Sequence, residues 1–118
     1  MAALAKIRAA CKALPGATFD IKWGKDMCYS VGGKMFAVME EHGKEGASIS
    51  FKVDDHRFLE LTDREGIIPA PYMAKHKWVL VQDPKKVSDA ELKDLIVTSH
   101  ALVAAKLPKK TRVALIGE

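Results

Sequence analysis

The stretch that decides the fold is residues 27–39, MCYSVGGKMFAVM, in which two apolar runs flank Gly32 and Gly33. A two-residue Gly-Gly link between strand-like runs is typical of a β-hairpin, because tight hairpin turns need a positive φ. Glycine adopts such a φ without a Cβ clash. A two-residue link predicts the cross-strand pairs Val31–Lys34, Ser30–Met35 and Tyr29–Phe36.

Both faces of this hairpin are largely apolar, which predicts a place in the middle of a sheet rather than at its edge. One face is expected to carry Met27, Tyr29, Val31, Lys34, Phe36 and Val38. The other face is expected to carry Cys28, Ser30, Met35, Ala37 and Met39.

The segments on either side of the hairpin alternate in the same way. Residues 17–23 and 47–53 place every second side chain on an apolar face, as half-buried strands do. A turn at 24–26 and a polar loop at 40–46 connect them to the hairpin, which makes an antiparallel meander. The opposite face of the sheet is then polar, with Thr18, Asp20, Lys22, Ser48, Ser50 and Lys52.

Helical spacing frames these strands. Residues 2–14 carry an apolar stripe that ends at Pro15. Residues 54–65 form a helix-like stretch that Asp54 or Asp55 can cap, and Ser88 with Glu91 forms a capping box before a long apolar period. Residues 78–81 read as a further short strand. The order α-β-β-β-β-α-β-α predicts an α+β fold of two layers, with the helices on one face of a mainly antiparallel sheet.

Composition favours an ordinary folded domain. The chain has 118 residues, 48% of them hydrophobic, and a net charge of +4. We expect one domain over 1–118 with a basic tail at 108–118. Cys11 and Cys28 have no metal-binding or redox spacing, so we expect buried free thiols and a cytoplasmic location. No run reaches the ~18 apolar residues that a membrane span needs.

An ordered series of motifs runs from Leu14 to Lys110: LPGATFDIKWG, VGGKMFA, SISFKV, GIIPAPYMAKHKWVLV and SDAELKDLIVTSHALVAAKLPKK. This series resembles the MmcQ/YjbR family of small bacterial proteins. The resemblance implies a frataxin-like (CyaY-like) fold and DNA binding through a double-wing arrangement, in which the Gly32-Gly33 hairpin and Lys34 are natural parts of a wing.

DNA binding of this kind depends on cations that neutralise phosphates. The candidate contacts are Lys22, Lys34, Lys52, Lys75, Lys77, Lys109, Lys110 and Arg112. Trp23, Trp78 and Tyr72 are able to stack on bases if exposed. The two tryptophans fall within apolar patterns, so we expect them in the core.

A second hypothesis is a non-catalytic protein-interaction module. It would use the open sheet face and the loop from Pro69 to Tyr72, with Tyr72 and Met73 as partner contacts.

Enzymatic and metal-binding functions find little support in the residues. The four histidines form no HExxH or paired i, i+4 site, and no phosphate loop or nucleophile elbow is present. Iron binding by analogy with frataxin would need carboxylates in the first helix, which carries only Lys and Arg charges. We therefore expect no enzyme activity, no metal and no cofactor.

Overall fold

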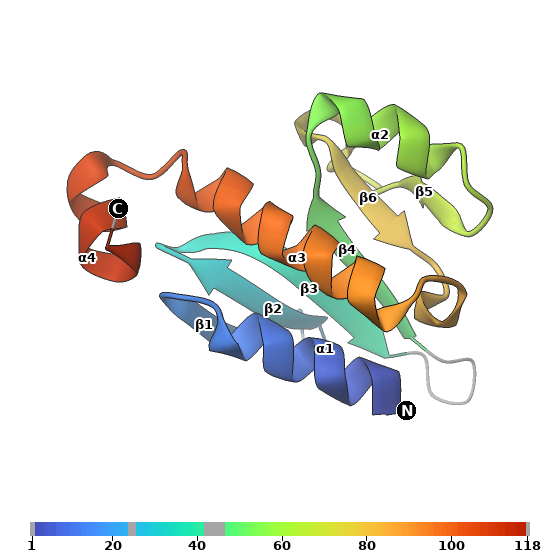
Figure 1. The fold of residues 1–118 in the computed structure, drawn as a ribbon, viewed down its shortest axis with the longest axis horizontal. Helices are drawn as coiled ribbons and strands as arrows, with labels where there is room; N and C mark the ends of the chain where they lie inside the picture. The colour runs from blue at the N-terminus through green and yellow to red at the C-terminus, as the bar shows by residue number, and fades with distance from the viewer. Residues whose placement is uncertain (1, 24–25, 42–46, 118) are drawn as a thin grey trace.

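The centre of the molecule is an antiparallel sheet of strand order β1-β2-β3-β4-β6-β5 (Figure 1). The computed structural model describes residues 2–23, 26–41 and 47–117, with the backbone alone at 2–4 and 85. Most of the predicted turn at 24–26 and loop at 40–46 lies outside these residues, but Asp26 belongs to β2, and Glu40 and Glu41 belong to β3 rather than to the loop. The strands are β1 (Ala17–Lys22), β2 (Asp26–Val31), β3 (Lys34–Glu41), β4 (Ala47–Lys52), β5 (Ile67–Pro69) and β6 (Trp78–Val81).

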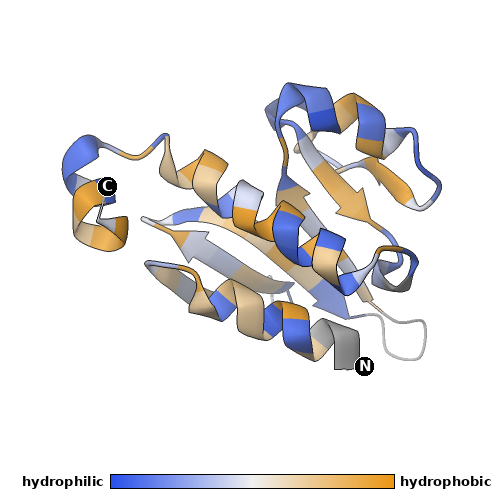
Figure 2. Ribbon diagram, viewed as in Figure 1, coloured by the Kyte–Doolittle hydropathy of each residue, from blue (hydrophilic) through white to orange (hydrophobic). Residues whose placement is uncertain are grey.

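Helices cover one face of this sheet, which confirms the predicted two-layer α+β fold (Figure 1). They are α1 (Ala2–Ala13), α2 (Asp55–Thr62), α3 (Asp89–Ala104) and, at one end, α4 (Lys109–Ile116), with short 3-10 turns η2 (Ala74–His76) and η3 (Pro84–Lys86). Figure 2 shows hydrophobic residues concentrated in β6, whereas hydrophilic residues cover much of α2. In the described part of the chain, no helix is long and apolar enough to cross a membrane.

Ser88 caps α3 as predicted, because the amide of Glu91 donates to Ser88 Oγ at 3.1 Å. The carboxylate of Glu91 also accepts two hydrogen bonds from the Arg64 guanidinium, at 2.9 and 3.0 Å. These two bonds connect the segment after α2 to the first turn of α3.

The hairpin forms as expected at its tip and differs further along. Gly32 and Gly33 have φ values of 58° and 82°, the pair of positive values that a type I′ turn requires. The predicted pairs Val31–Lys34 and Ser30–Met35 are present.

Beyond these pairs the register shifts, and the expected pair Tyr29–Phe36 is wrong, because Tyr29 lies opposite Ala37. Phe36 is the extra residue of a β-bulge. Its ring is buried in the core and meets the His100 ring edge-on, with 5.1 Å between centroids.

The bulge exchanges the predicted faces of the second half of β3. Met39 now lies opposite Met27 and is fully buried in the core, whereas Val38 lies opposite Cys28 and is only partly buried. Side chains alternate along a strand, so one extra residue moves every later side chain to the other face.

The first strand is less buried than its alternating pattern predicts. β1 is an edge strand with β2 as its only neighbour in the described sheet, and Ile21 is 55% exposed. Phe19 is partly covered by Tyr29, at 5.1 Å between ring centroids, and by the amine of Lys12, at 5.2 Å.

Two elements were not expected as such. The Pro-rich segment after α2 begins with strand β5, in which Pro69 is tolerated because β5 lies at the sheet edge. The basic tail predicted at 108–118 forms α4, and Gly117 ends this helix with a φ of 79°.

Ser99 supplies a test of how the layers are joined. Its buried hydroxyl donates to the carbonyl of Phe36 at 2.6 Å and accepts from the amide of Lys52 at 3.0 Å. We expect Ser99→Ala to lower the free energy of unfolding by about 3 kcal/mol, because two backbone groups lose their partner. Urea unfolding measures this loss. The control Ser30→Ala should cost less than about 0.5 kcal/mol, and equal losses for the two variants would contradict the assignment.

The two hairpin glycines form a matched pair. An alanine Cβ at Gly33 would meet nothing within 4 Å, whereas at Gly32 it would lie 2.7 Å from two methyl groups of the buried Leu107. We expect Gly33→Ala to cost about 1–2 kcal/mol from the positive φ alone, and Gly32→Ala to cost about 1–3 kcal/mol more from overpacking. Denaturation midpoints of the two variants measure the difference, and a smaller loss at Gly32 than at Gly33 would refute it.

Candidate nucleic-acid interface

A cationic pocket lies where the hairpin tip, the end of β4 and the segment after α3 meet. Lys34 begins β3 and Lys52 ends the antiparallel β4, so the two lysines fall at the same end of the sheet. The cavity has a volume of about 330 Å³ and is referred to below as the lysine pocket. Its lining residues are Lys34, Met35, Lys52, Met73, His76, Trp78, Val103 and Lys106.

Lys52 is the most constrained cation of the lysine pocket. Its amine donates to the carbonyl oxygen of His76 at 2.6 Å, which fixes the side chain across the gap between β4 and η2. Burial lowers the pKa of Lys52 below its ordinary value, and the charge of Lys106 lowers it further, while Asp55 opposes the shift. The pocket therefore holds a cation that lacks the full solvation of a surface lysine.

Lys77 lies beside a neighbouring hollow that shares Lys52 and Lys106 with the lysine pocket. Its amine is placed over the ring of Phe58, 5.0 Å from the centroid. Asp54 and Asp55 line the same hollow. The charge of Lys77 thus faces carboxylates as well as lysines.

The other predicted contacts are spread over the surface. Lys75 is exposed on η2, and Lys22 is half-buried at the end of edge strand β1, outside the lining of the lysine pocket. Lys109 and Lys110 are exposed on α4, whereas Arg112 lines a separate groove against α1 and α3. The structure therefore brings together Lys34 and Lys52, with Lys77 adjacent.

Lys106 was missed as a contact by the sequence analysis. It precedes Leu107 and Pro108, and the available signal was the basic run that follows them at 109–112. Its approach to Lys52 depends on how α3 lies across the sheet, which no local pattern specifies.

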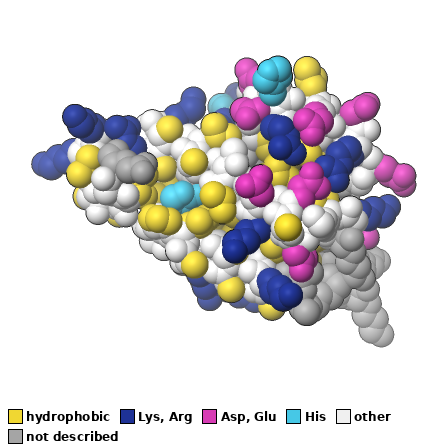
Figure 3. Space-filling model, viewed as in Figure 1, with side chains coloured by type: hydrophobic (Ala, Val, Ile, Leu, Met, Phe, Trp, Pro, Cys, Tyr) yellow, Lys and Arg dark blue, Asp and Glu magenta, His cyan; other side chains and the backbone are white. Residues whose placement is uncertain are grey.

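The charges on the helical side differ between its two ends. Figure 3 shows Lys and Arg gathered over α4, whereas the acidic side chains over α2 and the start of α3 lie among Lys and Arg. Ion pairs at that end join Arg57 to Glu60, Arg64 to Glu91 and Lys86 to Glu65. Carboxylates offset the cations there, so the α4 end and the hairpin tip are the better surfaces for an anionic partner.

A second pocket lies on the open face of the sheet, beside the Pro-rich loop. It has a volume of about 380 Å³ and is referred to below as the aromatic pocket. Its lining residues are Trp23, Asp26, Met35, Val38, Ser50, Ala70, Pro71, Tyr72, Met73 and Trp78.

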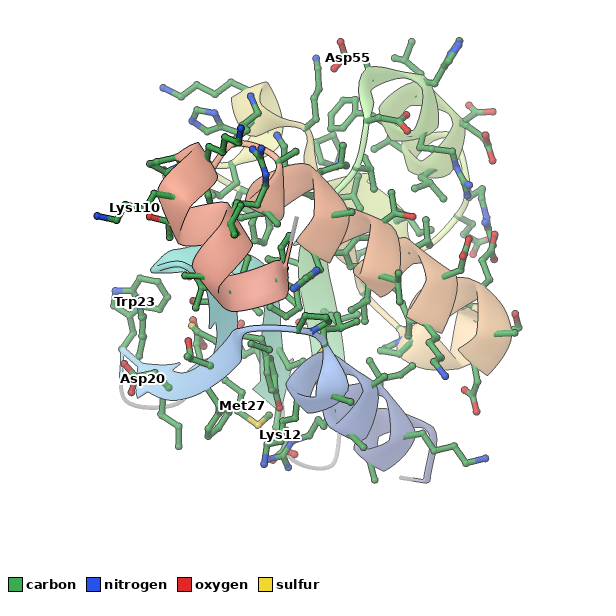
Figure 4. The ribbon with its side chains drawn as sticks, turned by 60° about the vertical axis from the view of Figure 1, so that its left-hand side comes forward. Lys12, Asp20, Trp23, Met27, Asp55 and Lys110 are labelled. Carbon is green, nitrogen blue, oxygen red and sulfur yellow. The ribbon has the colours of Figure 1, made fainter. Side chains whose placement is uncertain are left out.

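This pocket corrects two expectations. Trp23 was predicted in the core but is 71% exposed, because its φ of 52° turns the chain at the end of the edge strand (Figure 4). Trp78 is 5% exposed, as predicted. The open face is also not simply polar, since Met35 and Val38 line the pocket and the loop with Ala70 lies beside them.

Tyr72 and Met73, the predicted partner contacts, line this pocket, but their side chains differ in exposure. Tyr72 is 99% exposed and has a φ of 65°, a rare backbone conformation for a residue with a Cβ. Met73 is half-buried and belongs to the lining of both pockets.

Both cysteines are buried free thiols, as predicted. Burial raises the pKa of Cys11 to about 12 and also raises the pKa of Cys28. A reactive cysteine needs the thiolate form, which a raised pKa disfavours. Among the described residues, no group of three or more His, Cys, Asp and Glu side chains is arranged to hold a metal ion.

The fold and the two pockets define a class of protein: a small α+β domain whose sheet has one open face with an aromatic hollow and, at its end, a cluster of lysines. The chain belongs to the YjbR family, whose model matches residues 12–102.

A crystal structure of a protein from Pseudomonas syringae, from the Northeast Structural Genomics Consortium, has the same fold. The TM-score is 0.65 and the sequence identity 24%, over 85% of this chain and 97% of that one. No curated protein matches the chain.

The electrostatic coupling inside the lysine pocket is open to direct measurement. We expect Lys106→Gln to raise the pKa of Lys52, because a repelling charge is removed, while burial still holds that pKa below its ordinary value. Carbon-13 NMR of the Lys52 Cε resonance against pH measures the shift. Lys110→Gln is the control and should leave the titration of Lys52 in place, and an unchanged Lys52 in Lys106→Gln would disprove the coupling.

Proposed function

We propose that this YjbR-family domain binds DNA, mainly through phosphate contacts at the lysine pocket. The observation that supports the proposal is the convergence of Lys34, Lys52 and Lys106 on one cavity, from three separate segments of the chain. Three cations gathered without a carboxylate in the lining are costly by themselves and favourable around an anion.

The state of Lys52 adds to this support. Its amine is partly desolvated and repelled by Lys106, and both effects lower its pKa. A phosphate in the pocket would offset both effects, because it restores an acceptor and an opposite charge. Phosphate binding releases counterions from the DNA, which makes the affinity fall steeply with salt.

The hairpin tip suits the wing that the family resemblance implies. The Gly32-Gly33 turn and Lys34 are exposed, and Lys34 both ends the turn and lines the lysine pocket. Lys75, Lys109 and Lys110 are further exposed cations that would lengthen the contact with a duplex. Backbone contacts of this kind position a protein on DNA without reading its sequence.

The proposed role is binding without catalysis, in the cytoplasm. Both thiols are buried with raised pKa values, which disfavours cysteine nucleophiles. Free thiols also suit a reducing compartment.

A second candidate is a protein-interaction module on the open sheet face. The observation that favours it is the exposure of Trp23 and Tyr72, since exposed aromatic residues are enriched at protein interfaces. In that case Tyr72→Ala would weaken binding of a protein partner and leave DNA affinity unchanged.

The test of DNA binding is a duplex titration at several salt concentrations. The slope of log K against log salt is negative, and we expect its magnitude to decrease by about two units in the double variant Lys34→Gln/Lys106→Gln. Each phosphate that is no longer neutralised reduces this magnitude by close to one unit. The matched control is Lys6→Gln/Lys93→Gln, which removes the same charge from exposed positions of α1 and α3.

We expect this control to change the slope by less than about half a unit, because neither lysine neutralises a phosphate. Equal slopes for the two double variants would show that net charge alone matters. Absence of binding at about 50 mM salt, where phosphate contacts are strong, would refute the proposal.

A further inference from the structure

The aromatic pocket and the lysine pocket adjoin each other. Met35, Met73 and Trp78 line both cavities, so these three side chains are the shared boundary. The volumes, about 380 and 330 Å³, each fall within the range of small-molecule sites. One side of this boundary is cationic and the other is aromatic.

The aromatic pocket is lined by two exposed aromatic rings and one buried ring. Trp78 is almost fully buried, whereas Trp23 and Tyr72 are exposed and reach the pocket from the end of β1 and from the Pro-rich loop. Figure 4 shows Trp23 projecting on the same side of the molecule as Lys110 of α4. Exposed rings around a hollow are suited to stacking on a flat ligand.

The backbone at both exposed rings is in an uncommon conformation. Trp23 has a φ of 52° and Tyr72 a φ of 65°, in the left-handed region that residues with a Cβ rarely adopt. Two such aromatic residues, about 50 positions apart in the sequence, line one pocket. Strained conformations of this kind concentrate at binding sites.

The same pocket contains an acceptor that lacks a donor. Oδ1 of Asp26 is buried and has no hydrogen-bond partner among the described residues. Buried polar atoms are almost always hydrogen-bonded, so an unpaired carboxylate oxygen in a cavity points to a ligand that donates.

A cationic ligand such as a methylated amine would satisfy rings and a carboxylate equally well in isolation. The neighbouring cations oppose it, because Lys34, Lys52 and Lys106 lie across the shared boundary and repel a positive charge. A ligand with a flat donor group and an attached negative charge satisfies both pockets. A nucleotide has this chemistry.

We infer that the aromatic pocket receives an unpaired base of a nucleic acid whose phosphate occupies the lysine pocket. The inference rests on the proposed function and deepens it, because it makes the preferred ligand a single strand or an unpaired segment. The base stacks on Trp23 and Tyr72, and a base N–H donates to Asp26. Guanine is the preferred base, since its N1–H and N2–H groups offer a carboxylate two donors on one edge.

Base stacking on Trp23 and Tyr72 is tested by measuring the affinity for a short oligothymidylate that carries one central guanine, and for the duplex of the same sequence. We expect Trp23→Ala and Tyr72→Ala each to weaken single-strand binding about tenfold, with duplex affinity changed less than twofold. Leu59→Ala is the matched control, because Leu59 is a large exposed apolar residue on α2, outside both pockets.

The contact between Asp26 and guanine is tested by comparing this oligonucleotide with one in which the guanine is replaced by thymine. We expect the wild-type protein to prefer guanine about tenfold, as a bidentate contact discriminates between bases, and the near-isosteric Asp26→Asn to reduce this preference below about twofold. Asp20→Asn, exposed on β1, should keep the preference. Urea midpoints of all variants show whether the fold is retained.

Three outcomes would overturn the inference, and they are distinguishable. If the single-strand affinity of Trp23→Ala and Tyr72→Ala is unchanged and the salt dependence of duplex binding is intact, the base pocket is refuted and backbone binding stands. If the wild-type protein binds no nucleic acid, the base pocket and the proposed DNA binding are both refuted. Trp23-dependent binding of a trimethyl-lysine peptide, without competition by the oligonucleotide, assigns the pocket to a cation.

Discussion

The hydroxyl of Ser99 is the contact on which the rest of the structure depends. It bonds the carbonyl of Phe36 and the amide of Lys52, which are 63 and 47 positions away in the sequence. Phe36 is the bulged residue of β3, with no opposite residue in β2, and Lys52 ends β4. A single buried hydroxyl therefore satisfies two backbone groups where regular pairing stops, and it fastens α3 to both strands.

This contact also links the core to the lysine pocket. Lys34 lies two positions before the bulge, and Lys52 is itself bonded by Ser99, so both cations extend from backbone that α3 holds in place. The amine of Lys52 is fixed in turn by the carbonyl of His76. Side chains held in this way lose less freedom when they bind an anion, and binding is correspondingly tighter.

The local sequence pattern was sufficient to predict most helices and strands, but it was not sufficient to predict where they depart from regular geometry. Alternation, the Gly-Gly pair and the Ser88 cap predicted β1 to β4, the hairpin tip and α3 correctly. The bulge was not predictable, because Phe36 is apolar and suits either face, and its position is decided by contacts with α3. The exposure of Trp23 depends on a positive φ that an apolar pattern does not indicate. The meeting of Lys106 with Lys52 is likewise a product of tertiary packing.

The same irregularities explain why the open face is hollow and aromatic. Without the bulge, Val38 would join Tyr29 on the helix-covered face, and Met39 would lie on the open one. With it, Met39 fills the core and the shorter Val38 lines the aromatic pocket. The positive φ of Trp23 then places a large ring beside this hollow instead of continuing the edge strand. The lining of the open pocket therefore depends on two local departures from regular strand geometry, the bulge at Phe36 and the positive φ at Trp23.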